Sequence, residues 1–125
     1  DSIEKLTKDH SMVQEFVDMG QIKEEEADSH KLSNVVTKAL GSADSLEPDI
    51  SVFNIEHGDR ILLSTDGLFR VLNIDSVKDV LSGSISAEEK CKTLVDKTIE
   101  GGAPDNVSVI ILEANKKGLL NRIFS

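Results

Sequence analysis

The sequence predicts an α+β fold in which antiparallel strands bring distant residues to one edge of a sheet. The first observation is a short apolar run at 61–63, bounded by turn-prone residues at 57–59 and 66–67. The second is a longer apolar run at 107–112, which follows a turn-rich loop at 101–106. The third is a pair of segments between these runs that carry helix start and stop signals. A chain of 125 residues buries a modest core, so we expect at most one domain.

The first expected helix begins at Ser11 and ends at Gly20. Its apolar positions follow helical spacing, and glycine commonly ends a helix. The charge run at 23–26 then predicts a solvated helical face. A short strand is expected over 34–40, closed by Gly41.

A further strand is expected over 50–55, after Pro48 and Asp49. The turn-prone residues 57–60 would reverse the chain into the strand that leads to Asp66. The sequence therefore predicts that these two strands are antiparallel neighbours.

Two helices are expected between Asp66 and the last strand. Asn73 or Asp75 caps the first, which ends at Gly83. The second begins with a capping box at 86–89 and runs to about Glu100. The single cysteine, Cys91, falls at helical spacing with apolar residues of this helix, so we expect a buried structural thiol, and one cysteine excludes an internal disulfide.

The charge balance limits the classes of partner. The chain has 14 Lys and Arg against 23 Asp and Glu, a formal net charge of −9. Such an acidic excess argues against binding to nucleic acid or to an anionic membrane surface. We also find no apolar run near the ~20 residues that span a bilayer and no signal segment, so the sequence predicts a soluble, cytoplasmic protein.

Two aspartates are the candidate site residues. Asp66 ends the strand at 61–63 and is followed by Gly67, and Asp105 precedes the strand at 107–112. If these strands pair antiparallel, both carboxylates lie at one sheet edge. Mg²⁺ and Mn²⁺ prefer such oxygen ligands, so the pair predicts a metal site. Each aspartate taken alone is also an ordinary turn residue.

Four segments in order resemble the later half of the type 2C metal-dependent protein serine/threonine phosphatases. They are Thr-Lys-Asp-His-Ser at 7–11, Val-Thr-Lys-Ala-Leu-Gly at 36–41, Leu-Ser-Thr-Asp-Gly-Leu at 63–68 and Gly-Gly-Ala-Pro-Asp-Asn-Val-Ser at 101–108. The resemblance spans about residues 4 to 114. It implies part of an α-β-β-α sandwich with antiparallel sheets and a binuclear metal centre at one edge.

The resemblance also implies a division of the chain and of the chemistry. Residues 1–114 would form the C-terminal part of the catalytic domain, with a flap-like region at about 12–41, and residues 115–125 a tail. The interleaved basic and apolar residues of this tail predict a terminal helix, with an amphipathic anchor or a docking peptide as alternatives. Asp66 and Asp105 would be ligands of Mn²⁺ or Mg²⁺, and no residue here is assigned a catalytic role. The other ligands and the arginine that binds phosphate would come from the missing N-terminal half, so we expect a truncated chain that is inactive alone.

Two positions depart from the family pattern. Lys38 stands where the family usually has arginine, and Arg70 stands where it commonly has an acidic or polar residue. His10 is expected to cap a local turn, with orientation of Asp9 or contact with bound phosphate as the alternatives. The implied partners are a phosphoprotein substrate, the missing half of the domain and a cognate serine/threonine kinase, in a bacterial setting.

Two alternatives remain open at this point. The chain could be an inactive phosphatase-like module that serves interaction or regulation. It could also be a small metal-binding protein that is complete in itself, although two carboxylates alone should bind metal weakly.

Overall fold

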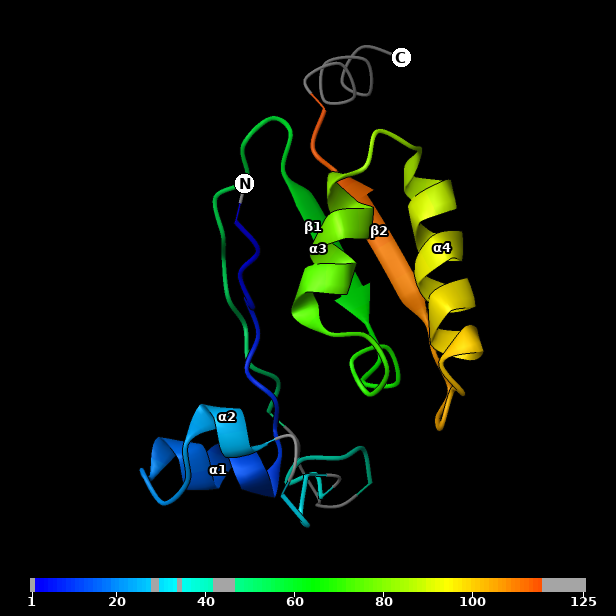
Figure 1. Cartoon of the computed structure of the whole chain (residues 1–125). Coiled ribbons are helices and arrows are strands. Elements are labelled where there is room, and N and C mark those ends of the chain that lie inside the picture. Colours follow the sequence, from blue (N-terminus) through cyan, green and yellow to red (C-terminus); the bar gives the residue numbers. More distant parts are fainter. Residues whose placement is uncertain (1, 28–29, 34, 42–46, 116–125) are drawn as a thin grey trace. The chain divides into compact units, whose positions relative to one another are not determined.

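The computed structural model of the protein describes residues 2–27, 30–33, 35–41 and 47–115 (Figure 1). The chain divides into two compact units, residues 1–52 and residues 53–125. Apart from its first residue, the tail predicted for 115–125 lies outside the described residues. Within the described part of the chain, no helix is long and apolar enough to cross a membrane.

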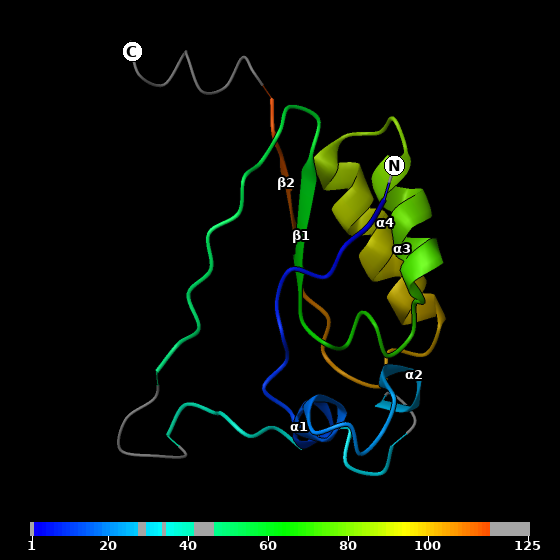
Figure 2. The ribbon, with the colours of Figure 1, turned by 90° about the vertical axis from the view of Figure 1, so that its left-hand side faces the viewer.

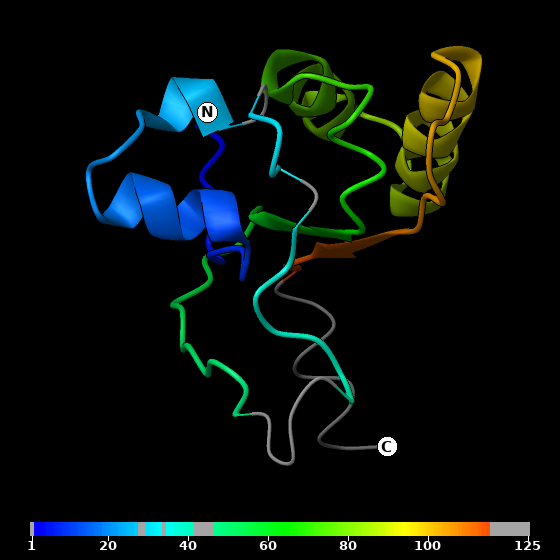
Figure 3. The same cartoon turned by 90° about the horizontal axis from the view of Figure 1, so that it is seen from below.

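The first unit contains two short helices. Helix α1 spans Met12–Asp18, and the Ser11 hydroxyl caps it by accepting a hydrogen bond from the Gln14 backbone N–H at 3.2 Å. The chain leaves the helix at Gly20, which has a φ of +68°. The helix predicted from Ser11 to Gly20 is therefore confirmed. Helix α2, Glu24–Ala27, packs beside α1 and carries the predicted charge run (Figure 3).

The strand predicted over 34–40 is reduced to one bridge among the described residues. Ser11 and Val36 form an isolated antiparallel bridge, and the Thr37 N–H donates to the His10 carbonyl at 2.8 Å. A ladder requires a partner segment that stays extended. Here the partner turns into α1 directly after Ser11, so the pairing stops at one bridge.

The prediction of a strand over 50–55 is wrong. These residues are extended but belong to no strand, and Ile50 and Val52 have 85% and 92% of their surface exposed. The turn at 56–59 does form, since the Asp59 N–H donates to the Glu56 carbonyl at 3.2 Å. The backbone of this turn then bonds to Ala114 and not to the preceding segment, because the strand that follows the turn pairs with residues 109–113.

The second unit is built on a two-stranded antiparallel sheet. Strand β1, Arg60–Ser64, pairs with β2, Val109–Glu113, from Arg60 opposite Glu113 to Ser64 opposite Val109. Both strands were predicted from their apolar runs, and their pairing gives the antiparallel sheet of the predicted α+β class.

Helices α3 and α4 lie on the same side of the two strands (Figure 2). Helix α3, Ile74–Ser82, is capped by Asn73, and α4, Ala87–Glu100, begins with the predicted capping box of Ser86 and Glu89. Helix α4 packs on β2, and α3 packs on α4. The apolar core of this unit is formed by Leu68, Val77, Leu81, Leu94 and Ile111.

One buried charge was not predicted from the sequence. Lys90 in α4 has 1% of its side chain exposed, and its Nζ donates to Oε1 of Glu113 at 2.7 Å. Arg60 Nε donates to the same oxygen at 3.3 Å. The ion pair therefore ties α4 to the far end of the sheet. Cys91, expected to be buried, is half-buried.

Candidate metal centre

The strand pairing carries Asp66 to the end of the loop that holds Asp105, where this loop enters β2. Beyond the last ladder pair, the Thr65 N–H donates to the Ser108 carbonyl at 3.1 Å. The Thr65 hydroxyl donates to the Asn106 carbonyl at 3.2 Å and accepts from the Ser108 N–H at 3.0 Å. Figure 1 shows the turn after β1 and the loop before β2 at the same end of the sheet.

Gly67 permits the close approach of these two segments. A Cβ at this position would overlap the Asn106 carbonyl oxygen and would lie 3.6 Å from the Cβ of Asp105. The residue that follows Asp66 is therefore held against the residue that follows Asp105. Glycine is required here because any side chain would push the two segments apart.

The end of α4 sets the course of the Asp105 loop. The Ala103 N–H donates to the Thr98 carbonyl at 3.1 Å, and the Gly102 N–H donates to the Ile99 carbonyl at 3.0 Å. Gly102 has a φ of +103°. This pair of bonds and the left-handed glycine form a Schellman motif, which ends the helix and turns the chain towards Asp105.

Asp66 and Asp105 converge on one cation, the guanidinium of Arg70. Asp66 Oδ2 accepts hydrogen bonds from Arg70 Nη2 at 2.8 Å and from Nε at 3.2 Å, and Asp105 Oδ2 lies 3.6 Å from the same Nε. Arg70 reaches this place because the chain after Asp66 makes a helical turn, in which the Arg70 N–H donates to the Asp66 carbonyl at 3.1 Å. Residues four apart in such a turn share a face.

The charged cluster of Asp66, Asp105 and Arg70 is open to solvent, while the turn that carries Asp66 and Arg70 is anchored in the core. The side chains of Asp66, Asp105 and Arg70 are 70%, 43% and 33% exposed, whereas Leu68 within the same turn is fully buried. The hydrogen bonds from Arg70 to Asp66 have the largest effect and raise the pKa of the guanidinium. Burial opposes this, and the charges of Asp66 and Asp105 add smaller upward effects. Arginine side chains are charged in proteins near neutral pH, so the cluster holds a permanent cation.

The donor chemistry of this cluster fits a hard divalent cation in part. Two carboxylates face a point that a cation already occupies, and oxygen ligands suit Mn²⁺ and Mg²⁺. The Asp105 carboxylate is also oriented, because its Oδ1 accepts from the Asn106 N–H at 2.8 Å. No third acidic, histidine or cysteine side chain joins them among the residues that the structure describes.

The other residues singled out from the sequence lie in the first unit. His10 Nε2 lies 2.6 Å from Asp49 Oδ2, and Lys38 Nζ donates to Asp49 Oδ1 at 3.2 Å. The hydrogen bond from His10, and then the bond and charge of Lys38, lower the pKa of the Asp49 carboxyl. His10 therefore contacts a residue far along the chain instead of capping a local turn. Sequence reasoning missed Asp49, whose position after Pro48 indicated only the start of a strand.

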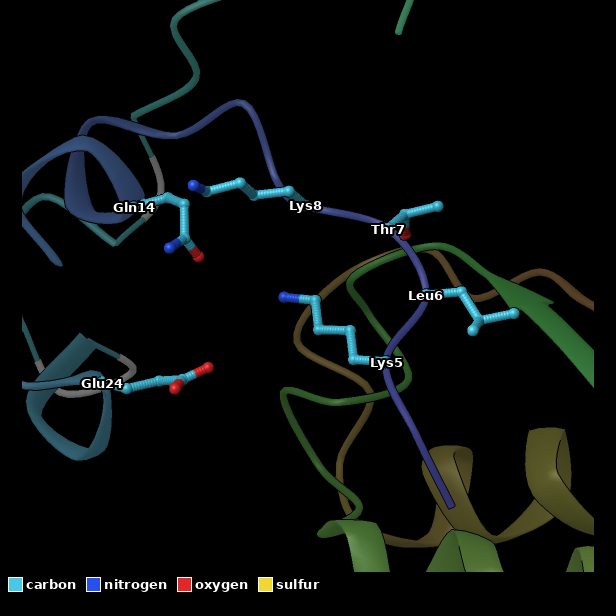
Figure 4. A pocket seen from close by; sticks show the side chains of 6 residues that line it. All are labelled: Lys5, Leu6, Thr7, Lys8, Gln14 and Glu24. Carbon is cyan, nitrogen blue, oxygen red and sulfur yellow. The ribbon is translucent and has the colours of Figure 1, made fainter. Parts of the chain in front are cut away.

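A pocket in the first unit offers little for metal binding. It is lined by Lys5, Leu6, Thr7, Lys8, Gln14 and Glu24, and Figure 4 shows Lys5 and Glu24 pointing towards each other across it. Lys5 forms an ion pair with Asp9 at 2.7 Å, and Lys8 forms one with Asp18 at 2.6 Å. Glu24 is the one acidic residue in this lining, so the pocket lacks a pair of carboxylates for a divalent ion.

Known proteins that resemble the chain are phosphatases. No protein-family model matches it. The chain is 34% identical over 113 residues to the protein phosphatase PhpP of Streptococcus pneumoniae. This match covers 90% of the chain and 46% of PhpP. The chain is also 37% identical over 107 residues to a putative protein phosphatase 2C-type of Streptococcus pyogenes. This match covers 86% of the chain and 44% of that protein.

Solved structures give the same result. The serine/threonine phosphatase PstP/Ppp of Mycobacterium tuberculosis matches with a TM-score of 0.84 and 32% identity, over 91% of this chain and 48% of that one. The catalytic domain of PstP in complex with two manganese ions matches with a TM-score of 0.72 and 32% identity, over 85% of this chain and 43% of that one.

The chain thus spans about half the length of the curated relatives it matches. The predicted fold class is confirmed, because the matching structures are phosphatases of this kind and the chain combines helices with an antiparallel sheet. The relatives and solved structures that the chain matches are type 2C protein serine/threonine phosphatases, and the chain corresponds to about half of each.

Proposed function

We propose that the chain forms part of the catalytic domain of a metal-dependent phosphatase that hydrolyses phosphoserine and phosphothreonine in proteins. The observation that carries this proposal is the convergence of Asp66 and Asp105 on one cation. In this proposal, residues 1–114 are the C-terminal part of the domain, with the flap-like region at about 12–41, and residues 115–125 are a tail.

Asp66 and Asp105 would hold Mn²⁺ or Mg²⁺ through their carboxylate oxygens. A pair of such ions, when bound, supplies an activated water and neutralises the charge of the phosphate. A relative in this family has been solved with two manganese ions, which supports a binuclear centre. Because the described residues bring two carboxylates together, the other ligands and the phosphate-binding group would come from the other half of the domain.

The residues of this chain would position the two carboxylates. The buried Leu68 anchors the turn that carries Asp66, and the Asn106 N–H orients the carboxylate of Asp105. Gly67 lets the two segments meet without a side chain between them. Ligands held by rigid supports bind metal without a large cost of ordering.

The exposed face of the sheet supports an incomplete domain. On the face away from Leu62 and Ile111, the side chains of Leu63, Ile110 and Leu112 are 50%, 57% and 52% exposed. A two-stranded sheet of this kind is marginally stable without further packing. Covering this face with the other half of the domain would bury apolar surface and stabilise the unit.

The finer predictions rest on the resemblance. A phosphoprotein is the proposed substrate, a serine/threonine kinase the proposed opposing partner, and the cytoplasm the proposed location. The sequence similarity to bacterial phosphatases supports the first of these directly.

The proposal is tested by joining the first half of the Streptococcus pneumoniae relative to this chain. We expect this chimera to hydrolyse p-nitrophenyl phosphate and a phosphoserine peptide with Mn²⁺, and the 125-residue chain alone to be inactive. Asp66→Asn and Asp105→Asn should each abolish turnover by the chimera. Asp79→Asn, which removes an exposed carboxylate of α3, serves as the matched control.

Three results would count against the proposal. Brisk turnover by the chain alone would contradict the division of the site between two halves. Full activity in the Asp66→Asn chimera would contradict the assignment of this residue. A chimera that folds and binds Mn²⁺ but hydrolyses neither substrate would favour an inactive interaction module.

A further inference from the structure

Arg70 occupies the one place where the two candidate ligands meet. It donates two hydrogen bonds to Oδ2 of Asp66, at 2.8 and 3.2 Å, and lies 3.6 Å from Oδ2 of Asp105. Those two oxygens are therefore turned towards the guanidinium. A metal ion that bound through these same two oxygens would have to displace the guanidinium.

The charges give Arg70 a role in holding the two carboxylates together. Two carboxylates in close proximity repel each other, and a single guanidinium between them offsets part of that repulsion. A divalent ion at the same point would offset it fully. Arg70 and a metal ion are thus alternative counter-ions for the same pair of side chains.

Arg70 can leave the site by moving and not by losing its proton. Its hydrogen bonds to Asp66 raise the pKa of a group that is already fully protonated near neutral pH. One third of its side chain is exposed, so rotation about its side-chain bonds brings the guanidinium into water. Exposed ion pairs are weak, and the exchange should therefore be reversible.

We propose that Arg70 is an internal counter-ion that keeps Asp66 and Asp105 together in the metal-free protein and competes with the divalent metal for them. This inference rests on the proposed function, since it takes the two aspartates as metal ligands. Its consequence is that Arg70 weakens metal binding while preserving the geometry of the site.

The test is a titration of the 125-residue chain and its Arg70→Gln variant with Mn²⁺ up to about 10 mM, because a pair of carboxylates binds weakly. Bound Mn²⁺ is measured by loss of the electron paramagnetic resonance signal of the free ion. We expect Arg70→Gln to bind roughly two- to tenfold more tightly, the range for losing one or two exposed ion pairs. Arg70→Lys, which keeps the charge without the planar fork, should lie between them.

Arg60→Gln is the matched control. Arg60 lies at the other end of β1, is 36% exposed and pairs with Glu113 at 3.3 Å. Its replacement removes the same charge from the same unit without touching the cluster. We expect the affinity of this variant for Mn²⁺ to stay within about twofold of the wild-type value, because exposed charges at this distance are screened by salt.

Thermal unfolding without metal provides a second readout. Arg70→Gln should lower the midpoint temperature at low salt, and added NaCl should recover it, because salt screens the repulsion between Asp66 and Asp105. Addition of Mn²⁺ should raise the midpoint of Arg70→Gln more than that of the wild type.

The outcomes separate this inference from the proposed function. Equal Mn²⁺ affinity in the wild type and Arg70→Gln, with binding abolished by Asp66→Asn in both, would overturn the competition and leave the metal site standing. Weaker binding by Arg70→Gln would also overturn it. If neither form binds Mn²⁺, the competition is overturned for this chain, and the Asp66→Asn and Asp105→Asn variants of the chimera decide the ligand assignment separately.

Discussion

Gly67 and Asn106 lie so close that a Cβ on residue 67 would overlap the carbonyl oxygen of residue 106. This contact joins the turn after β1 to the loop before β2, and each segment carries one of the two candidate ligands. The distance between Asp66 and Asp105 therefore depends on the absence of a side chain at position 67.

Gly67→Ala should open the candidate site. The added methyl would force the two loops apart, and we expect the free energy of unfolding to fall by about 1–3 kcal/mol, as for other overpacked positions. Urea denaturation measures this change, and Mn²⁺ affinity should fall with it. Gly83→Ala is the control, because Gly83 has a φ of −59° and its new Cβ would lie 3.3 Å from the Val80 carbonyl oxygen. Equal losses in the two variants would contradict the prediction.

Leu68→Ala should loosen the turn that carries Asp66. Leu68 is fully buried, so its truncation should cost about 2–5 kcal/mol of unfolding free energy, from lost apolar burial and the cavity left behind. Phe69→Ala is the comparison, since Phe69 is 47% exposed and should cost less. Denaturant midpoints for the two variants provide the measurement, and a smaller loss at Leu68 than at Phe69 would refute this account of the turn.

The ion pair between Lys90 and Glu113 should respond differently to the loss of each partner. Glu113→Gln leaves the ammonium of Lys90 buried without a charged partner, so we expect a clear fall in the melting temperature. Lys90→Met removes the buried charge at similar volume and should be the milder change, even though it leaves Glu113 with Arg60 alone. The reverse order of melting temperatures would show that burial of Lys90 carries no such cost.

Acid should destabilise the second unit through Glu113. The hydrogen bond from Lys90, and then the nearby charges, lower the pKa of this carboxyl below its ordinary value of 4.5. A lowered pKa in the folded state stabilises the fold above the ordinary value, and this stabilisation is lost as the pH falls through the folded-state pKa. Melting temperatures should therefore decline below about pH 4.5.

Glu113→Gln should show a shallower decline over the same acidic range, because a glutamine does not titrate. Glu89 also contributes a slope there, since the Ser86 N–H and hydroxyl lower its pKa, so some decline should persist in the variant. Identical pH profiles for the wild type and Glu113→Gln would rule out this source of acid sensitivity.

Local signals predicted the helices of this protein well. The capping box at Ser86, the cap at Asn73 and the stop at Gly20 are each made by a few neighbouring residues, and all three form as expected. The pairing partner of β1 was harder to predict. An apolar extended segment lies on either side of it in sequence, at 50–55 and at 109–113, and the hydrogen bonds that decide between them come from distant residues.

The partners of charged residues were also hard to predict from the sequence. Lys90 occupies a helix that the sequence predicts, yet its burial follows from the approach of Glu113 in β2. Arg70 departs from the pattern that the resemblance implies, and the folded turn after β1 places its guanidinium beside both aspartates.

The sequence by itself predicted the helix ends, the two apolar strands and the resemblance to type 2C phosphatases, and it singled out the two aspartates as candidate ligands, because caps, apolar runs and motifs are properties of neighbouring residues. The tertiary structure decided that β1 pairs with β2, that Lys90 is buried and that Arg70 lies between Asp66 and Asp105. These relationships join residues far apart in the chain or depend on how a turn is packed, and packing becomes defined when the whole unit folds.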